Sequence, residues 1–338
     1  MKTDRFSTVD VVIAGGGPAG LSAALILGRA QRIVLLCDTD EPRSWASSSM
    51  HAFITREGIS PERFRELARK ELGKYPNVLA RAVEVTQAKR QRTGGFLVTT
   101  SRNQVICRKL LIATGVRDVL PPIDRVEEFF GKSVFQCPYC DGWEMQDRPT
   151  AVYGKRKRGF ELARAMTAWT RDIVLCSDGP SGLTRDQSRQ LARNGITVNE
   201  ARIASLTGTY GRLKGVVFKD GSTLPRSTLF FDLPTRAHSS LGESLGCRLT
   251  RNGRIACGQY EATNVSGVFV AGNVIDDVQL AIVAAAEGAR AAFGINRALT
   301  REDFEHRATG ARKVKHPGNA GDERSVTDYG RMPTPSRH

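Results

Sequence analysis

The stretch VDVVIAGGGPAGLSAALILGRAQRIVLLCD, residues 9–38, decides the fold of the first part of the chain. Its apolar run Val9–Ala14 ends at a glycine-rich turn, and Leu21–Arg29 then has the Ala- and Leu-rich composition of a helix. A second apolar run, Arg32–Cys37, closes on Asp38. The order strand, turn, helix, strand predicts a βαβ unit with parallel strands.

The turn of this unit has the spacing of a dinucleotide-binding loop. Gly15 allows the tight turn, Gly17 lets the backbone approach a pyrophosphate, and Gly20 lets the helix pack closely on the strand. The helix N-terminus offers unpaired N–H groups to phosphates. Asp38, at the end of the next strand, stands where a carboxylate accepts hydrogen bonds from a ribose. The alternative is a glycine-rich turn with no ligand. The predicted contacts are Gly15, Gly17, Pro18, Ala19, Gly20 and Asp38.

A second segment repeats this order. Thr150–Tyr153 predicts a strand and Gly154–Gly159 a turn. Phe160–Thr170 predicts a helix, and Asp172–Cys176 the next strand. The fold class is therefore α/β, with two Rossmann-like nucleotide-binding domains. Pro121-Pro122 is a candidate junction between them.

Other elements are predicted with less regular patterns. Ser60 is a candidate N-cap for a helix over Pro61–Leu72. Three short strands are expected, at Phe96–Thr100, Val105–Cys107 and Lys109–Ala113. A strand at Gly267–Ala271 precedes a long Ala-rich helix over Gln279–Leu299. The polar stretch 301–338 is expected to be a disordered tail.

Composition limits the function classes. The chain of 338 residues has a net charge of +15 but no apolar run near the about 20 residues that a membrane helix needs. Met1–Asp10 lacks a secretory pattern, so a cytoplasmic protein with no membrane association is expected. Aromatic residues do not interleave with the basic ones, so nucleic acid is not the expected partner. An acidic partner or a phosphate-bearing cofactor makes better use of the charge.

Cys137-Pro138-Tyr139-Cys140 is the one close pair among seven cysteines. A thiol at a helix start has a lowered pKa, and Pro138 suits the first helical position, so a redox pair is predicted. Asp141 follows directly and can shuttle the proton that thiol exchange needs; its alternative is a turn former. The other interpretations are half a zinc site or two unrelated buried thiols. The nearest further ligands, Cys176 and His238, form no second pair, so no metal site is expected.

Four segments, in order, resemble the low-molecular-weight thioredoxin reductase family of flavoproteins. They are Gly15–Gly20, Ala113-Thr114-Gly115, Cys137–Gly142 and Gly267–Gly288, and the resemblance covers about residues 8–300. Within the family the chain is similar to a branch with CPYC and a loop after the first acid. Here that loop reads Glu41-Pro42-Arg43-Ser44, followed by His51-Ala52-Phe53-Ile54-Thr55.

The resemblance implies a function and a domain plan. It implies FAD, with electrons passing from NAD(P)H to FAD, then to Cys137–Cys140, then to a thioredoxin-like protein or a small disulfide. It implies a discontinuous FAD-binding domain, residues 1–117 and 242–300, and an NAD(P)H-type domain, residues 118–241, that carries the CxxC. It also implies a homodimer. In the relatives the two domains rotate, which is a hypothesis here.

The resemblance also implies roles for single residues. Cys140 would face the flavin, Cys137 would attack the external disulfide, and Asp141 would be the general acid. Arg43 is also an implied cofactor contact, because it lies in the loop Glu41–Ser44 that is similar to the family's branch. The remaining implied cofactor contacts are Ala113, Thr114, Gly115, Gly272, Asn273, Gln279, Leu280 and Ala281 for FAD, and Gly154 and Gly159 for NADPH.

Three departures from the family pattern leave the electron donor open. Asn273 replaces the usual Asp, although an amide still bonds ribityl hydroxyls. Arg156 stands where the middle glycine of the second turn is expected. Ser177-Asp178-Gly179-Pro180 lacks the family's basic cluster for the 2′-phosphate of NADPH. The alternatives are a dithiol oxidase that uses oxygen, a ferredoxin-fed reductase, and a flavin-bound redox sensor without turnover.

Overall fold

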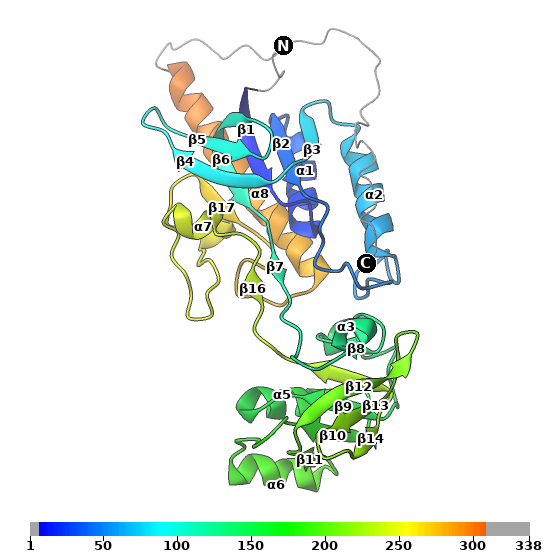
Figure 1. Cartoon of the computed structure of the whole chain (residues 1–338). Helices are drawn as coiled ribbons and strands as arrows, with labels where there is room; N and C mark the ends of the chain where they lie inside the picture. Colours follow the sequence, from blue (N-terminus) through cyan, green and yellow to red (C-terminus); the bar gives the residue numbers. More distant parts are fainter. Residues whose placement is uncertain (1–6, 309–338) are drawn as a thin grey trace. The chain divides into compact units, whose positions relative to one another are not determined.

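The computed structural model describes residues 7–308, and the chain divides into two compact units (Figure 1). Within the described residues, unit 1 comprises residues 7–42, 65–116 and 237–308, and unit 2 comprises residues 43–64 and 117–236. The chain passes between the units after Pro42, after Phe64 within α2 (Pro61–Leu72), and at the short strands β7 (Val116–Arg117) and β16 (Arg236–Ala237). Within residues 7–308, no helix combines the length and apolar composition needed to cross a bilayer.

Unit 1 is built on one sheet with strand order β3-β2-β1-β6-β5-β4, and β17 pairs with β6 as well. The strands are β1 (Thr8–Ala14), β2 (Val34–Asp38), β3 (Val78–Ala82), β4 (Val85–Arg90), β5 (Phe96–Thr100), β6 (Gln104–Ile112) and β17 (Val268–Val270). β3, β2, β1, β6 and β17 are parallel to one another, and β5 and β4 continue the sheet as antiparallel strands beside β6. The first βαβ unit is thus confirmed, with Ala14 beside both Cys37 and Ile112.

Two helices, α1 (Pro18–Arg29) and α8 (Ala281–Ala308), pack against each other and against this sheet (Figure 1). Their close approach needs a glycine, because a Cβ on Gly288 would lie 2.0 Å from the carbonyl oxygen of Ala19. The other helices of unit 1 are α7 (Leu241–Ser244), the 3₁₀ turn η1 (Gln259–Glu261) and most of α2 (Pro61–Leu72). Ser60 Oγ accepts a hydrogen bond from the Arg63 amide at 3.1 Å, which confirms the predicted cap.

Unit 2 contains a parallel sheet with strand order β11-β10-β9-β15-β8 and an antiparallel sheet β12-β13-β14. The strands are β8 (Val134–Phe135), β9 (Thr150–Tyr153), β10 (Ile173–Cys176), β11 (Thr197–Asn199), β12 (Ile203–Thr209), β13 (Arg212–Phe218), β14 (Thr223–Pro225) and β15 (Thr228–Phe231). The helices are α3 (Val126–Phe129), α4 (Pro138–Asp141), α5 (Arg156–Met166) and α6 (Arg185–Arg193).

Both faces of the parallel sheet in unit 2 are covered. Ala151 and Tyr153 of β9 belong to one buried cluster, and Val152 between them belongs to another. β9, β10 and β15 are therefore buried along their whole length, as expected for central parallel strands. Their continuous apolar runs explain why β9 and β10 were predictable from sequence.

The structure corrects three sequence expectations. The two strands expected at Val105–Cys107 and Lys109–Ala113 are one strand, β6, because Arg108 continues the strand between them. The helix expected from Phe160 begins at Arg156, so most of the second turn is helical. The tail expected to be disordered from residue 301 is helical to Ala308.

The extension of α8 has a physical cause in ion pairs with the sheet and the turn before β2. Asp303 pairs with Arg32 and Arg108, and Glu302 pairs with Arg108 and Lys109. These contacts anchor a polar helical turn that has few apolar residues of its own. The rest of the expected tail, residues 309–338, lies outside the described residues.

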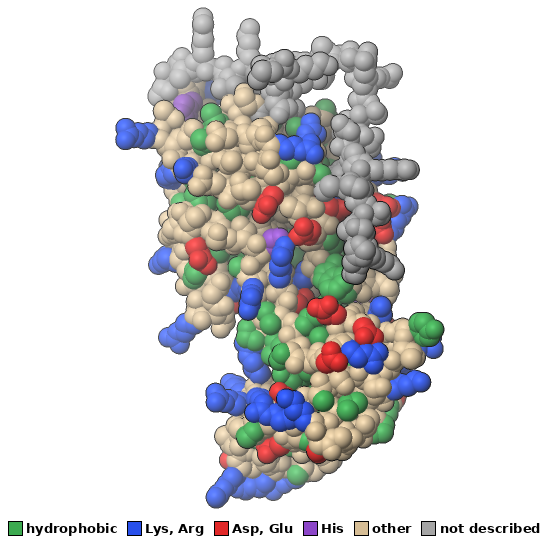
Figure 2. Space-filling view, in the orientation of Figure 1, with side chains coloured by type: hydrophobic (Ala, Val, Ile, Leu, Met, Phe, Trp, Pro, Cys, Tyr) green, Lys and Arg blue, Asp and Glu red, His purple; other side chains and the backbone are tan. Residues whose placement is uncertain are grey.

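Basic side chains are spread over the surface. On the face drawn in Figure 2, the described Lys and Arg side chains form small groups separated by other residues. Several are paired with acids, as Arg164 is with Glu161 and Arg125 with Glu128. The net charge of +15 therefore gives no single basic groove among the described residues of this face.

Candidate functional site

The first glycine-rich turn has the shape that a pyrophosphate site requires. A Cβ on Gly15 would lie 2.3 Å from the carbonyl oxygen of Ala113, and a Cβ on Gly20 would lie 1.9 Å from that of Gly15. A Cβ on Gly17, by contrast, would meet no described atom within 4 Å. Gly17 is also the N-cap of α1 and has no side chain to bond the helix amides. The turn is thus closed where helix and strand pack, and open where a ligand would approach.

Asp38 lies beside this turn, as its position at the end of β2 predicted. Its Oδ1 accepts a hydrogen bond from the Gly16 amide at 3.2 Å, and its Oδ2 accepts one from Arg69 at 3.0 Å. A carboxylate oxygen accepts more than one hydrogen bond, so both remain able to bind a ribose hydroxyl. Arg69 also bonds Asp40 at 2.7 Å.

Three residues of unit 1 have buried polar atoms without a hydrogen-bond partner among the described residues; one is Glu261, through its Oε2 in η1, and two concern this site. The two at this site are Thr114 Oγ1 and the Nε and Nη1 atoms of Arg65, which is near Asp40. Buried polar atoms are normally satisfied, and an orphan calls for an explanation. Thr114 lies in the Ala113-Thr114-Gly115 segment directly after β6, next to the glycine-rich turn. These orphans, together with the open space at Gly17, fit a dinucleotide such as FAD in unit 1.

The segment between β17 and α8 completes this edge of the sheet. Gly272 has a φ of +78°, and its amide donates a 2.7 Å hydrogen bond to Glu287 Oε2. Burial raises the pKa of Glu287 to about 7, although the Gly272 amide opposes this shift. Asn273 follows Gly272, and α8 begins at Ala281 after a turn in which the Leu280 amide bonds the Val278 carbonyl. The roles of Asn273, Gln279, Leu280 and Ala281 stay predictions.

The cysteine pair lies in unit 2, at the start of a one-turn helix. Cys137 and Cys140 form a disulfide with a Cα–Cα distance of 5.2 Å. Cys137 is the N-cap of α4 and Pro138 is at its start, as predicted, and the Cys140 amide points to Cys137 Sγ at 3.1 Å. Because α4 has four residues, a helix macrodipole contributes little; the local Cys140 N–H is the group that favours a thiolate on Cys137.

Asp141 is the acid that shares this helix turn. Burial raises the pKa of its carboxyl from 3.8 to about 7. The positive charge of His51 opposes this shift, and the negative charge of Glu144 adds to it. An acid that titrates near neutral pH is suited to both giving and taking a proton.

The other buried thiols do not share these properties. Burial raises the pKa of Cys37, Cys107 and Cys176 to about 12 in each case. They therefore stay protonated at neutral pH and pack as small apolar side chains. Among the described cysteines, Cys137 and Cys140 are the two that form a disulfide, and their redox role stays a prediction.

The second turn meets only part of the requirement for a dinucleotide. A Cβ on Gly154 would lie 2.7 Å from the Cα of Gly159, so these two glycines keep the close packing of strand and helix. The Arg156 amide, however, donates a 2.7 Å hydrogen bond to the carbonyl of Ser181. Lys155 Nζ bonds the carbonyl of Asp178 at 2.8 Å. The Arg156 amide and the Lys155 ammonium group could otherwise bind a phosphate. Both are instead hydrogen-bonded to the segment after β10.

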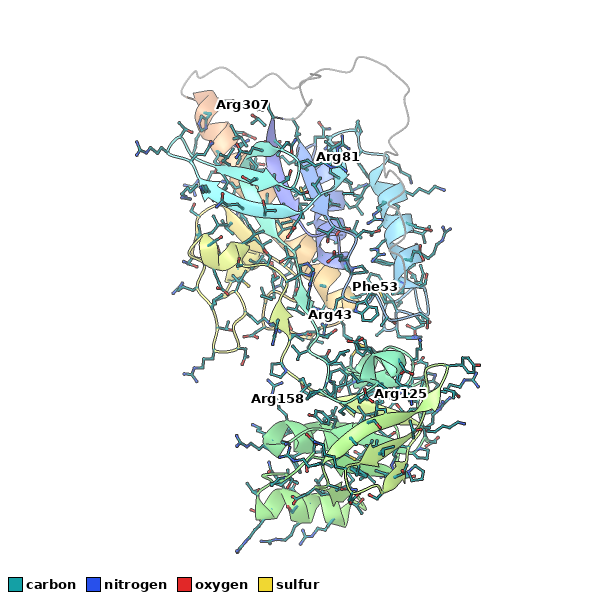
Figure 3. The ribbon with its side chains drawn as sticks, in the orientation of Figure 1. Arg43, Phe53, Arg81, Arg125, Arg158 and Arg307 are labelled. Atoms are coloured by element: carbon teal, nitrogen blue, oxygen red, sulfur yellow. A yellow bond between two sulfur atoms is a disulfide. The ribbon has the colours of Figure 1, made fainter. Side chains whose placement is uncertain are left out.

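Arg43 belongs to unit 2, whereas the glycine-rich turn belongs to unit 1. Its guanidinium (labelled in Figure 3) bonds both carboxylate oxygens of Asp118, at 2.6 and 2.9–3.0 Å, and the Gln136 side chain. Its expected role in cofactor binding stays a prediction. The pair instead ties residues 43–64 to the rest of unit 2.

Sequence reasoning missed several residues of these two sites. Arg65 and Arg69 reach Asp38 and Asp40 from α2, and their i, i+4 spacing on one helix face was a usable signal. Glu287 had no such signal, because only the packing of α8 makes it buried. No sequence signal pointed to His51 and Glu57 either, because no local pattern shows that their loop lies near the segment of Asp141 and Glu144.

Comparisons with known proteins agree with this geometry. The family described as pyridine nucleotide-disulphide oxidoreductase matches residues 9–288. Thioredoxin reductase tcpT of Claviceps purpurea is 30% identical over 276 residues, which cover 78% of this chain and 86% of the relative. The solved structure of HlmI has a TM-score of 0.86 at 34% identity and covers 91% of this chain and 98% of its own.

A third comparison gives the same fold. An oxidoreductase from Agrobacterium tumefaciens has a TM-score of 0.81 at 30% identity, and covers 87% of this chain and 99% of its own. The two α/β units thus have the fold of both solved structures, at TM-scores of 0.81 and 0.86. The chain therefore belongs to the pyridine nucleotide-disulphide oxidoreductases, and within them it is a thioredoxin reductase-like enzyme that acts on sulfur groups.

Proposed function

We propose that this chain is an FAD-dependent disulfide oxidoreductase in which Cys137–Cys140 exchanges electrons with an external disulfide or dithiol. The observation that carries the proposal is the disulfide next to Asp141, a partly buried carboxyl with its pKa raised to about 7. Thiol–disulfide exchange needs a thiolate to attack and an acid to protonate the leaving sulfur. The Cys140 amide favours the thiolate on Cys137, and Asp141 holds the proton.

The FAD would be held by unit 1. Gly15, Gly17 and Gly20 shape the turn, Asp38 offers its oxygens to the ribose, and Thr114 has a hydroxyl without a partner among the described residues. When bound, FAD supplies a two-electron carrier that a nicotinamide or a dithiol reduces. Asn273 and Gln279–Ala281 are the further contacts that we propose.

The remaining parts of the proposal follow the relatives. We propose a thioredoxin-like protein or a small disulfide as substrate, NADPH as electron donor, a homodimer and a cytoplasmic location. The name of one relative, NADPH-dependent thioredoxin reductase 3 of Arabidopsis thaliana, supports the donor; it is 27% identical over 87% of this chain. We propose the FAD-binding domain as residues 1–117 and 242–300, and the NAD(P)H-type domain as residues 118–241.

The proposal is tested by replacing the sulfur that is to face the flavin. Cys140→Ser should keep a stoichiometric flavin and lose disulfide reduction by at least about 1000-fold, because serine cannot form the disulfide. Flavin content is read from the absorbance spectrum and turnover from a disulfide reduction assay. Cys257→Ser, at an exposed cysteine of unit 1, is the matched control and should keep turnover. Turnover by the Cys140→Ser protein, or purified protein that takes up no flavin, would refute the assignment.

One observation favours a second candidate, a dithiol oxidase that hands electrons to oxygen. The Arg156 amide is bonded to Ser181, so the second turn offers no free amide there for a pyrophosphate. Electrons would then enter from a dithiol substrate through the same cysteine pair.

Anaerobic titration separates the two candidates. NADPH, NADH and dithiothreitol are added in turn to the flavin-loaded protein, and bleaching of the flavin is followed. Bleaching by NADPH supports the reductase. Bleaching by dithiothreitol alone, with oxygen uptake once air is admitted, supports the oxidase.

A further inference from the structure

His51 lies in a short closed loop of unit 2. The Met50 amide bonds the Ile59 carbonyl at 2.8 Å, and the Gly58 amide bonds the Met50 carbonyl at 3.0 Å. The loop between contains two non-glycine residues with positive φ, Ala52 at 59° and Thr55 at 69°. Such conformations persist where the surrounding structure holds them, and they cluster at functional sites.

Glu57 fixes the imidazole of His51. Its Oε1 lies 2.6 Å from His51 Nδ1, and its Oε2 accepts a 2.8 Å hydrogen bond from the Ala52 amide. The hydrogen bond from His51 is the main cause that lowers the pKa of Glu57, so this carboxylate is ionised and accepts only. Because an ionised carboxylate only accepts, His51 Nδ1 is the donor in its contact with Glu57.

A short aromatic contact supports the same loop. The rings of Phe53, labelled in Figure 3, and Phe64 at the start of α2 are 5.2 Å apart. His51 is itself mostly covered, with 18% of its side chain exposed. Glu57 is 63% exposed, so this pair connects a covered imidazole with solvent.

The imidazole of His51 contacts the segment that carries the acid of the cysteine pair. Glu144, three residues after Asp141, has its Oε1 3.5 Å from His51 Nδ1. The charged groups that act on Asp141 are His51 from the loop and Glu144 from its own segment. Their effects are opposite, because the cation favours the carboxylate and the anion favours the acid.

The redox chemistry of the cysteine pair involves protons as well as electrons, so a proton-exchanging group near Asp141 would assist it. Reduction of a disulfide to two thiols takes two electrons and two protons, and oxidation releases them. On the proposed function the two electrons come from the reduced flavin or from a dithiol substrate, and the two protons come from that donor or, through solvent, from water. A carboxyl holds one proton at a time, so a neighbouring group that exchanges protons with the partly buried Asp141 would assist both transfers.

We propose that His51, held by Glu57, is a positioning residue for Asp141 that sets its charge and exchanges its proton with solvent. The inference deepens the proposed function and rests on it. In the step from disulfide to dithiol, the proton moves from Asp141 to the leaving sulfur, and His51 returns a proton from water to Asp141. In the reverse step the same groups carry the proton outward.

The test is a pH titration of the Asp141 carboxyl in the oxidised, flavin-loaded protein. Infrared difference spectra follow the protonated carboxyl band, which is assigned by its loss in Asp141→Asn. His51→Gln should raise the midpoint by at least about half a pH unit, a threefold change in the ionisation constant. Glu144→Gln should lower the midpoint. His306→Gln, at an exposed histidine of unit 1, is the matched control and should leave it unchanged.

A kinetic measurement adds a readout of proton exchange. The rate of flavin bleaching by dithiothreitol is measured against pH in the same proteins. His51→Gln should shift the Asp141-dependent inflection upward, and the double variant with Asp141→Asn should behave like Asp141→Asn alone. Equal midpoints and profiles for the original protein and His51→Gln would overturn this inference. Bleaching that survives in Cys140→Ser would instead overturn the proposed function.

Discussion

At the first glycine-rich turn, neighbouring glycines serve different physical purposes. Gly20 is needed for packing, because an added methyl group would lie 1.9 Å from the Gly15 carbonyl. Gly17 is not needed for packing, because its φ of −74° suits alanine and the added methyl group would meet open space. A methyl group at Gly17 should therefore weaken the binding of a ligand without changing the packing of the fold.

This difference predicts opposite outcomes for two alanine variants. Gly20→Ala should lower the free energy of unfolding of the flavin-free protein by about 1–3 kcal/mol, as overpacking does. Gly17→Ala should leave that free energy unchanged but weaken FAD binding at least about tenfold, or about 1.4 kcal/mol. Urea unfolding and fluorescence titration with FAD measure the two quantities. Normal FAD affinity in Gly17→Ala would place the pyrophosphate elsewhere.

At the scale of elements, the contact between α8 and the turn after β17 contains a buried acid. Glu287 is 3% exposed, and it accepts the Gly272 amide. Burial raises its pKa from 4.5 to about 7, so between these pH values the folded protein keeps a proton that the unfolded chain has released. Stability contributed by this group therefore falls as the pH rises through that window.

Glu287→Gln tests this assignment. The amide oxygen can still accept the hydrogen bond from Gly272, but the variant carries no charge to bury. The stability difference between pH 5 and pH 8 should therefore be smaller than in the original protein by about 1–3 kcal/mol. Urea unfolding at both pH values measures it. Glu305→Gln, at an exposed acid of the same helix, should not change the difference.

At the scale of the whole molecule, each unit has a core of its own. The core of unit 1 includes Val12, Leu110 and Val270 from three strands of its sheet. Unit 2 has two buried clusters, one on each face of β9. A ligand held by one unit should therefore stabilise that unit first.

Hydrogen exchange with and without FAD tests this expectation. FAD at a hundred times its Kd should stabilise unit 1 by about 2.7 kcal/mol. Amides of the Gly15–Leu21 turn and of β17 should exchange more slowly, and those of β9 and β10 should keep their rates. Protection confined to β9 and β10 would contradict the assignment of FAD to unit 1.

The sequence by itself determined the features that depend on neighbours along the chain. The βαβ units, the Ser60 cap, the helix start at Cys137 and the position of Asp38 all follow from local spacing, and the structure confirms them. Periodicity and turn glycines carry this information because hydrogen bonding in helices and turns is local.

Only the tertiary structure decided which distant charges meet. His51 meets Glu144, Arg69 pairs with Asp38, and Asp303 anchors the last turns of α8 on Arg32 and Arg108. These pairs join residues that are far apart in sequence, so no local pattern specifies them. The path of the backbone determines their distance and burial, and with these the strength of each electrostatic interaction.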